Sequence, residues 1–267
     1  MSNPHIKVDH LEKLDNIRYD YIVKVIIIGD VGVGKSSILR MFTDYKFDQN
    51  SNSTIGIDFE TAFMEITHLN DRNEKTNNHP HDIGKYLTVS KDTTGLRKQI
   101  KHPVFKFQVW DCAGQEKFHS IVKSYIRGAH IIIYAFDITD RYSFSKLNKW
   151  RQSVETEAGL PGEGKYMSVV VGNKLDMEKN RQVSLNEGKE LAASLDTIYA
   201  EVSAKEDQNI QRLFQEITRI MYCKLLSGEF KMDHKSIVAN HQLLITTSKE
   251  SNEDDSDKCL PGKCVIV

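Results

Sequence analysis

The feature of the sequence that most constrains its fold is an apolar run that leads directly into a glycine-rich loop. Residues 22–28, IVKVIII, have the composition of a short buried strand, and residues 29–36, GDVGVGKS, have the spacing G-x-x-x-x-G-K-S. A helical pattern follows. Such a loop can hold a phosphate chain, because its backbone N–H groups and the positive end of the helix point at one place. The simpler interpretation is a glycine turn that only caps a helix.

Five short apolar segments indicate strands of one sheet, since each is rich in Val, Ile, Phe or Tyr and is bounded by polar or turn residues. They are residues 22–28, 104–110, 130–136, 166–171 and 197–202. A sixth segment, 54–66, alternates and is predicted as an edge strand. Between the strands, Ser184 and Glu187 have the spacing of a capping box, and residues 210–226 carry an apolar stripe. We therefore predict an α/β fold, a mostly parallel six-stranded sheet with helices on both faces.

Two segments interrupt the alternation of strands and helices. Residues 67–102 are 36 polar-rich positions between two strands that would otherwise form a hairpin, and we expect them to be an insertion. The N-terminal residues carry Ile6, Val8, Leu11, Leu14 and Ile17 at roughly helical spacing, which indicates either a helix packed on the domain or a disordered extension. The predicted parts of the chain are an N-terminal extension at 1–20, a main domain at 21–226 that contains the insertion, and a flexible tail at 227–267.

Composition excludes several classes of function. The 36 Lys and Arg residues nearly balance the 37 Asp and Glu residues, so no overall charge draws the chain to nucleic acid or acidic lipid. We expect no secretory signal and no membrane-spanning helix, because the required apolar stretches are missing. Four cysteines do not form a disulfide framework, which fits a reducing compartment.

Several side chains near the predicted strand ends suit phosphate and magnesium. Lys35 would lie against the β- and γ-phosphates, and the Ser36 hydroxyl would ligate Mg²⁺. In WDCAGQE at 110–116, Asp111 could hold the metal through water and the Gly114 amide could meet a γ-phosphate. Thr54 could supply a second hydroxyl to the metal.

The stretch GNKLD at 172–176, together with SAK at 203–205, indicates guanine. The Asp176 carboxylate can accept from the N1–H and the exocyclic amine of guanine, whereas adenine offers neither donor at that edge. A site with a buried carboxylate discriminates strongly against a ligand that leaves it unpaired.

These motifs, in this order, resemble the Ras superfamily of small GTPases over residues 21–226. The Rab branch is the most similar, through the stretches IGIDF, FQVWD, GQEKFHSI, SYIRGA and FDITDRYSF. Residues 150–158 and 172–183 are also similar to the late-endosomal and lysosomal Rabs. The resemblance implies a P-loop G-domain, a GTPase that cycles between GTP and GDP with Mg²⁺ and regulates vesicle traffic.

The resemblance also implies roles for individual residues. Gln115 would orient the attacking water, and Thr54 would belong to the first switch segment. The groups around the guanine would be Phe47 as its shield, Asn173, Lys174 and Asp176 as its frame, and the Ala204 amide on its oxygen. The full predicted nucleotide set is Asp30, Val31, Gly32, Val33, Gly34, Lys35, Ser36, Ser37, Phe47, Thr54, Asp111, Gly114, Asn173, Lys174, Asp176, Ser203, Ala204 and Lys205.

Expected partners follow from the same resemblance. They are an exchange factor, a GTPase-activating protein, a GDP-dissociation inhibitor or escort protein and GTP-dependent effectors, with the chain itself a monomer that binds no nucleic acid. Two other interpretations stay open: a GTP-bound scaffold without turnover, and a P-loop kinase or ATPase, which the NKLD stretch contradicts.

Val31 stands where Ras proteins have glycine, and a side chain there can crowd both Gln115 and an incoming arginine. We therefore expect slow intrinsic hydrolysis, against the alternative that the residue has no consequence. Cys112 stands where Rabs usually have threonine, and a small side chain that fits is favoured over a redox sensor.

The last four residues, Cys264 to Val267, fit the prenylation pattern C-a-a-X, and Cys259 could take a second lipid. Stable anchoring needs two signals, and the tail carries no polybasic patch. The expected location is the cytoplasmic face of endomembranes, with late endosomes or lysosomes favoured and a cytosolic pool.

Overall fold

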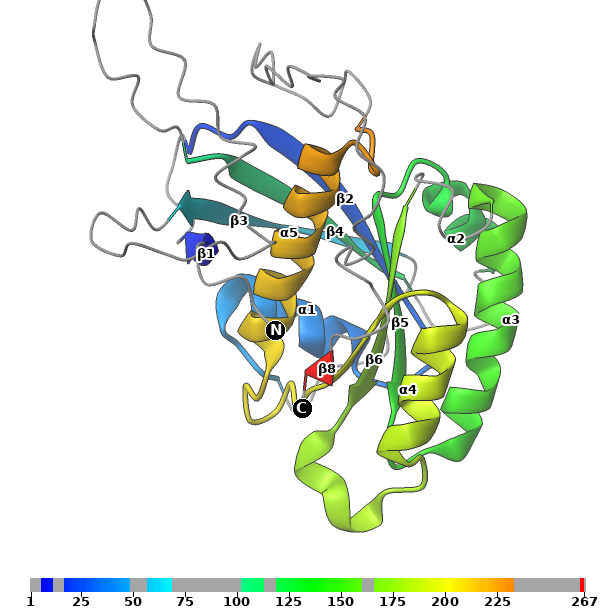
Figure 1. Cartoon of the computed structure of the whole chain (residues 1–267). Coiled ribbons are helices and arrows are strands. Elements are labelled where there is room, and N and C mark those ends of the chain that lie inside the picture. Colours follow the sequence, from blue (N-terminus) through cyan, green and yellow to red (C-terminus); the bar gives the residue numbers. More distant parts are fainter. Residues whose placement is uncertain are drawn as a thin grey trace, which may run out of the picture.

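A computed structural model of the chain describes residues 6–11, 17–48, 57–68, 102–112, 119–159, 166–232 and 265–266. Within them lies one eight-stranded sheet with the order β1-β3-β4-β2-β5-β6-β7-β8 (Figure 1). The strands are β1 (Ile6–Leu11), β2 (Tyr21–Ile28), β3 (Ile57–His68), β4 (Val104–Cys112), β5 (Ile131–Asp137), β6 (Met167–Asn173), β7 (Ile198–Glu201) and β8 (Val265–Ile266). The β1–β3 and β3–β4 pairs are antiparallel and the other five pairs are parallel. The predicted α/β class and the mostly parallel sheet are confirmed.

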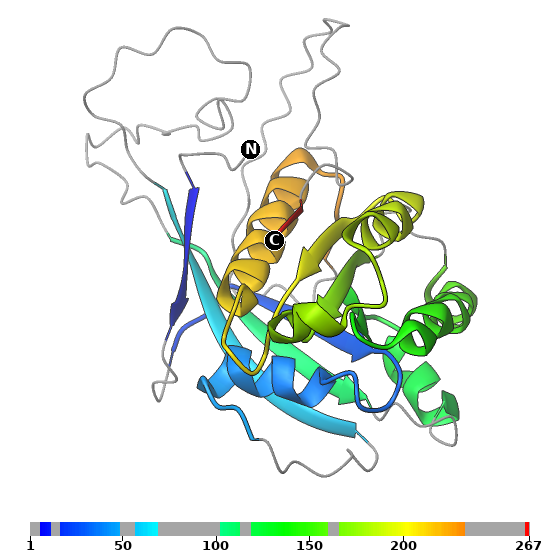
Figure 2. The same cartoon turned by 90° about the horizontal axis from the view of Figure 1, so that it is seen from below.

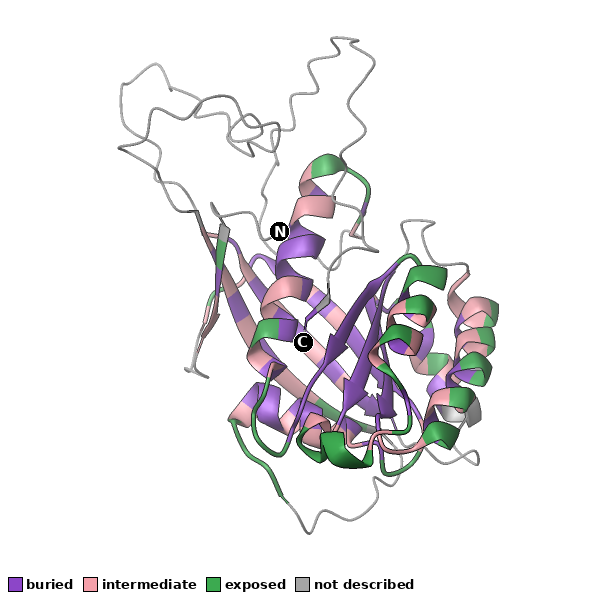
Figure 3. Cartoon of the chain, turned by 60° about the horizontal axis from the view of Figure 1, so that its bottom comes forward, coloured by how far each residue is buried: buried purple, intermediate pink, exposed green. Residues whose placement is uncertain are grey.

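Helices cover both faces of the sheet, as predicted (Figures 1 and 2). One face carries α1 (Lys35–Asp44) and α5 (Ile210–Ser227), and the other carries α2 (His119–Ile126), α3 (Arg141–Ala158) and α4 (Leu185–Ser194). A 3₁₀ helix, η3, spans Leu175–Asn180. Because helices lie on both sides, every residue of β5 and β6 is buried (Figure 3).

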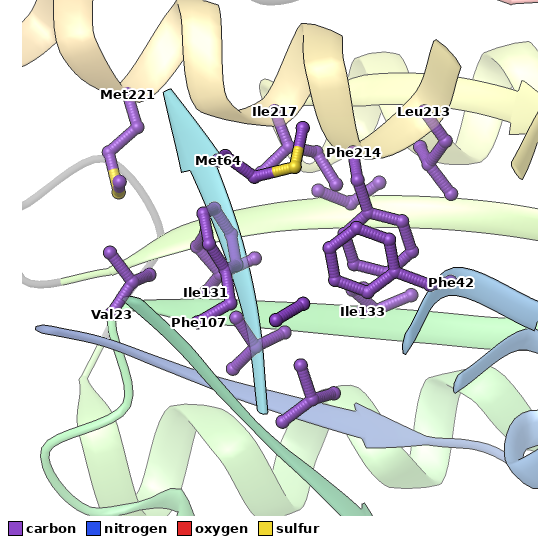
Figure 4. Close-up of a cluster of buried hydrophobic side chains, with 14 of the residues drawn as sticks. Val23, Phe42, Met64, Phe107, Ile131, Ile133, Leu213, Phe214, Ile217 and Met221 are labelled. Atoms are coloured by element: carbon purple, nitrogen blue, oxygen red, sulfur yellow. The ribbon is translucent and has the colours of Figure 1, made fainter. Parts of the chain in front are cut away.

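The core between the sheet and helix α5 is built on aromatic stacking (Figure 4). The rings of Phe42 from α1 and Phe214 from α5 stack with their centroids 3.6 Å apart. Phe107 of β4 approaches Phe42 edge-on, with centroids 6.1 Å apart. Helix α5 is the helix that the apolar stripe at 210–226 predicted, and it presents this stripe to the core.

The capping box predicted at the start of α4 is confirmed. The Glu187 N–H donates to the Ser184 hydroxyl oxygen over 3.3 Å, and the Ser184 N–H donates to the Glu187 carboxylate over 2.9 Å. Both orphan donors at this helix end are thereby satisfied.

The outer strands differ from the sequence prediction. The sheet has eight described strands rather than six because β1 and β8 add to its two sides. The helical interpretation of the N-terminal spacing is wrong for residues 6–11, which pair with residues 63–68 as a strand. Because β1 pairs with residues 63–68, β3 is not an edge strand over those residues.

The tail also begins and ends differently from the expected flexible segment. Phe230 is buried against the core formed by α5, and Val265 and Ile266 pair with Tyr199 and Ala200 of β7. Of the tail, residues 233–264 and 267 lie outside the described part. The boundaries at residues 20 and 226 stay predictions, although residues beyond both of them contribute strands to one sheet.

The two described ends of the predicted insertion, at the end of β3 and the start of β4, lie at the opposite end of the sheet from the carboxyl ends of the parallel strands. Strands β3 and β4 pair antiparallel, with Glu65 opposite Val104 and Ile57 opposite Cys112, so the insertion leaves the sheet at the amino end of β4. Residues 69–101 lie outside the described part. Among the helices that the structure describes, none combines the length and apolar character needed to cross a membrane.

Candidate functional site

The glycine-rich loop connects β2 to α1 at the carboxyl end of the sheet. Gly32 and Gly34 have φ values of 77° and 90°, a region that residues with a side chain rarely adopt. A Cβ atom on Gly34 would meet the Asn173 side-chain nitrogen at 2.3 Å, whereas one on Gly32 would meet nothing within 4 Å. The loop therefore needs glycine at position 34 both for its conformation and for its close approach to β6.

Lys35 is held inside this loop. Its Nζ donates to the Asp30 carbonyl oxygen over 2.8 Å, and the residue is only 6% exposed. Burial lowers the pKa of Lys35 below its usual value, and the nearby Asp111 carboxylate opposes that shift. A buried cation next to the N–H groups at the start of α1 can attract a phosphate group.

Ser36 and Asp111 lie in direct contact. The Ser36 hydroxyl, in the first turn of α1, donates to the Asp111 carboxylate near the end of β4. A hydroxyl oxygen and a carboxylate oxygen side by side are hard ligands of the kind that Mg²⁺ prefers. These two residues therefore fit a magnesium site next to the phosphate loop, and Thr54, its third predicted ligand, lies outside the described residues.

Asn173 joins the phosphate loop to the loop that follows β7. Its side-chain nitrogen donates to the Val33 carbonyl oxygen over 2.9 Å, and its side-chain oxygen accepts the Ala204 N–H over 3.2 Å. Asn173 and Ala204 are each 2% exposed. The two loops predicted to hold the phosphates and the base are thus fixed to one another by a single buried side chain.

The Asp176 carboxylate is oriented by the loop at residues 203–205. The Ser203 hydroxyl donates to one carboxylate oxygen of Asp176 over 2.6 Å, and the Lys205 ammonium lies 3.9 Å from the other. The same Ser203 hydroxyl oxygen accepts the Glu206 N–H over 3.1 Å. The carboxylate expected to read guanine is therefore already positioned by its neighbours.

Asp137 is a site residue that the sequence interpretation missed. Its carboxylate forms a 2.6 Å ion pair with Lys174, whose backbone has a φ of 67°, and accepts the N–H and hydroxyl of Thr139 over 2.8 and 2.7 Å. Its position directly at the end of the apolar run 130–136 was the available signal. Asp137 holds Lys174 beside the other nucleotide-loop residues.

The remaining predicted residues are placed as follows. Val31 and Phe47 are exposed, at 48% and 38%, so neither is committed to the protein core. Gly114 and Gln115 lie outside the described residues.

Cys112 is fully buried, and this burial, with Asp111 beside it, raises the pKa of its thiol to about 12. An un-ionised buried thiol fits the packing interpretation and not that of a redox sensor.

The fold and the loops at its carboxyl end define a P-loop nucleotide-binding domain of the α/β class. The Ras family model matches residues 76–223, and the model of the Ras of Complex (Roc) domain of DAPkinase matches residues 24–84. Since the first match covers more than half of the chain, the chain belongs to the Ras family of small GTPases, and its curated relatives are of the Rab type.

Three of those relatives come from distant organisms. The Ras-related protein SEC4 of Candida albicans is 36% identical over 76% of this chain and 79% of its own length. The Ras-related protein Rab-30 of Homo sapiens is 34% identical over 78% of this chain and 82% of its own length. The Ras-related protein RABE1e of Arabidopsis thaliana is 31% identical over 90% of this chain and 94% of its own length. The chain is therefore a GTP-binding small GTPase of the type that acts in vesicle transport on endomembranes.

Proposed function

We propose that this chain is a switch that binds GTP, hydrolyses it to GDP and phosphate, and recruits effectors while GTP is bound. The observation that carries the proposal is the Asn173 bridge, which fixes the phosphate loop and the base loop at one spacing. A nucleotide that spans both loops has its two ends held by one rigid frame. Guanine is the proposed base, because the oriented Asp176 carboxylate can accept from two of its donors.

In the proposed reaction, Gln115 orients the attacking water and Lys35 lies against the phosphates. Ser36, Thr54 and Asp111 are the proposed magnesium ligands. When bound, Mg²⁺ would neutralise charge that develops on the phosphate oxygens. The part of this chain is to place an ammonium group, a hydroxyl and a carboxylate around that position.

Nucleotide binding and turnover by the full-length chain test this function. We expect the purified protein to retain GDP or GTP, to release it faster when EDTA removes Mg²⁺, and to hydrolyse GTP to GDP. The Gln115→Leu variant should bind GTP as tightly and hydrolyse it far more slowly. GTP that remains intact on the wild-type protein would instead support a scaffold, and competition by ATP would support a kinase or ATPase.

We also propose that Val31 makes the intrinsic hydrolysis slow. Val31 is 48% exposed in the phosphate loop, and its N–H donates to the carboxylate of the neighbouring Asp30 over 2.8 Å. A branched side chain there occupies space next to the γ-phosphate region, which a water-orienting glutamine also needs. Single-turnover hydrolysis should rise several-fold in Val31→Gly, and an unchanged rate would show that the residue has no effect.

The proposed effector contact includes an aromatic ridge formed by Phe59 of β3, Trp110 of β4 and Tyr125 of α2. The Phe59 and Trp110 rings lie 4.7 Å apart, and the Trp110 and Tyr125 rings lie 4.9 Å apart. Phe59 is 41% exposed, a large apolar side chain that a partner could cover. Phe59→Ala should reduce capture of GTP-dependent partners without changing nucleotide affinity.

Membrane attachment through Cys264, with Cys259 as a second lipid site, belongs to the same proposal, as does a location on late endosomes or lysosomes. Both cysteines lie outside the described residues. The second anchoring signal is either a lipid on Cys259 or a protein partner. If Cys264→Ser releases the protein from membranes and Cys259→Ser does not, a second lipid on Cys259 is not that signal. Deletion of residues 70–100 should leave GTP hydrolysis unchanged, because the insertion leaves the sheet at the end opposite the site.

A further inference from the structure

Strand β1 lies beside the C-terminal end of helix α1. The residues that follow α1 lead to Phe47, which is predicted to shield the guanine. The six residues of β1 pair with residues 63–68 of β3, and Val8 is buried in the core beneath α5. On the same side of β1 as Val8, His10 reaches α1. The N-terminal strand is thus part of the domain and contacts the helix that follows the phosphate loop.

His10 packs between two aromatic rings of the α1 segment. Its ring meets Phe42 at 5.3 Å between centroids and Tyr45 at 5.5 Å, both edge-on, and the Tyr45 hydroxyl lies 3.5 Å from His10 Nδ1. Phe42 is fully buried and stacked on Phe214, so it is a fixed support. Tyr45, by contrast, is 53% exposed, and its ring is held from the side by His10.

Tyr45 has an unfavourable backbone conformation at the end of α1. Its φ is 54° and its ψ is 35°, the left-handed region that costs energy for any residue with a side chain. Its N–H closes the last turn of α1 by donating to the Arg40 carbonyl oxygen. Such a conformation persists only when surrounding contacts determine it, and the His10 contacts are of that kind.

The direction of the chain after Tyr45 sets the position of Phe47, two residues further on. Phe47 is exposed. The resemblance to small GTPases of the Ras superfamily implies that its ring shields the guanine. Any change of backbone conformation at Tyr45 would move Phe47 and the start of the first switch segment. If Phe47 has that role, retention of nucleotide depends on the packing of a residue outside the predicted main domain.

We propose that His10 is a positioning residue for nucleotide retention: β1 places its ring against Tyr45, which holds the left-handed turn that directs Phe47 over the base. The proposal rests on the proposed guanine-nucleotide function. Release of β1, for example by a partner that pairs with residues 63–68 of β3 in its place, then speeds nucleotide exchange without any contact to the nucleotide.

The rate at which bound fluorescent GDP leaves the full-length chain tests this inference. In His10→Ala we expect GDP to be released about fivefold faster, because Tyr45 loses the ring contact that stabilises its left-handed conformation. His10→Phe keeps a ring between Phe42 and Tyr45 and should restore the wild-type rate. Lys7→Ala is the matched control, because Lys7 lies on the same strand with an exposed side chain, and its ion pair among the described residues is with Asp9 over 2.9 Å.

A double variant separates positioning from a general loss of structure. In Tyr45→Gly the turn carries no steric penalty, so adding His10→Ala should cause no further acceleration. Equal release rates for wild type and His10→Ala, or equal acceleration by Lys7→Ala, would overturn the inference. Failure of the wild-type protein to bind GDP would instead contradict the proposed function and is a separate result.

Discussion

The side-chain amide of Asn173 donates to the carbonyl oxygen of Val33 over 2.9 Å, and this bond joins positions 140 residues apart in the sequence. The other end of the same amide accepts from the Ala204 N–H. Because both bonds are buried, removal of the amide leaves a backbone acceptor and a backbone donor without partners. The phosphate loop and the base loop then lose their common support.

Asn173→Ala should therefore destabilise the nucleotide-free domain by about 1–3 kcal/mol, the cost of leaving buried polar groups unpaired. Denaturant unfolding measures this change, and GDP release should be faster in the same variant. Asn148→Ala is the control, since Asn148 is an exposed position in the middle of α3. Equal stability of the two variants would contradict a bridging role for Asn173.

Alanine at Gly34 should impair GDP binding much more than alanine at Gly32. Both positions have positive φ, so both variants carry a backbone penalty of about 1 kcal/mol. Only the Gly34 variant adds a methyl group 2.3 Å from the Asn173 nitrogen, so the amide that donates to the Val33 carbonyl oxygen has to shift. Isothermal titration with GDP compares them, and equal losses of affinity would show that the close approach is unimportant.

Asp137→Asn should weaken GDP binding roughly tenfold, the order of magnitude for a lost charged hydrogen bond. The change removes the charge that holds the Lys174 ammonium at 2.6 Å while it keeps the size of the side chain. Asp140→Asn is a suitable control, because Asp140 caps α3 and asparagine caps a helix equally well. If both variants bind GDP like the wild type, the ion pair does not position Lys174.

Cys112 should resist alkylation in the folded protein across the neutral and mildly alkaline range. A pKa of about 12 means that its reactive thiolate form appears only as the pH rises towards that value. At pH 8.5 its thiolate population is on the order of a thousandfold below that of an ordinary cysteine. Peptide mass spectrometry after iodoacetamide treatment measures each cysteine separately, with the protein in denaturant as the fully reactive control. Rapid labelling of Cys112 in the native protein would contradict its burial.

Local rules explain which parts of the fold were predictable. The capping box at Ser184 and the apolar stripe of α5 follow from spacings of three and four residues, and both are confirmed. The strands at the centre of the sheet were equally clear, because burial on two faces gives continuous apolar runs such as β5.

The outer strands and the contacts of the site were harder to predict for a common reason. In β1, Val8 and His10 face one side, but the partners of His10 lie more than thirty residues further along the chain, and Tyr45 is 35 positions away. The sequence also offered no sign that Asp137 would meet Lys174 rather than solvent. Motif spacing located the nucleotide loops, while the bonds that join them depend on tertiary packing.

The pairing of β8 with β7 has a consequence for how far the domain stands from a membrane. Cys264 directly precedes β8, whose two residues pair with Tyr199 and Ala200. If Cys264 carries a lipid while β8 stays paired, only about 3.5 Å of chain separates the anchor from the sheet, and the domain rests on the bilayer. If β8 leaves, the chain between residues 233 and 264 allows an extended reach of up to about 110 Å. With a lipid on Cys264, the two residue pairs between β8 and β7 would decide whether the domain is held close to the bilayer or stands away from it on a long tether.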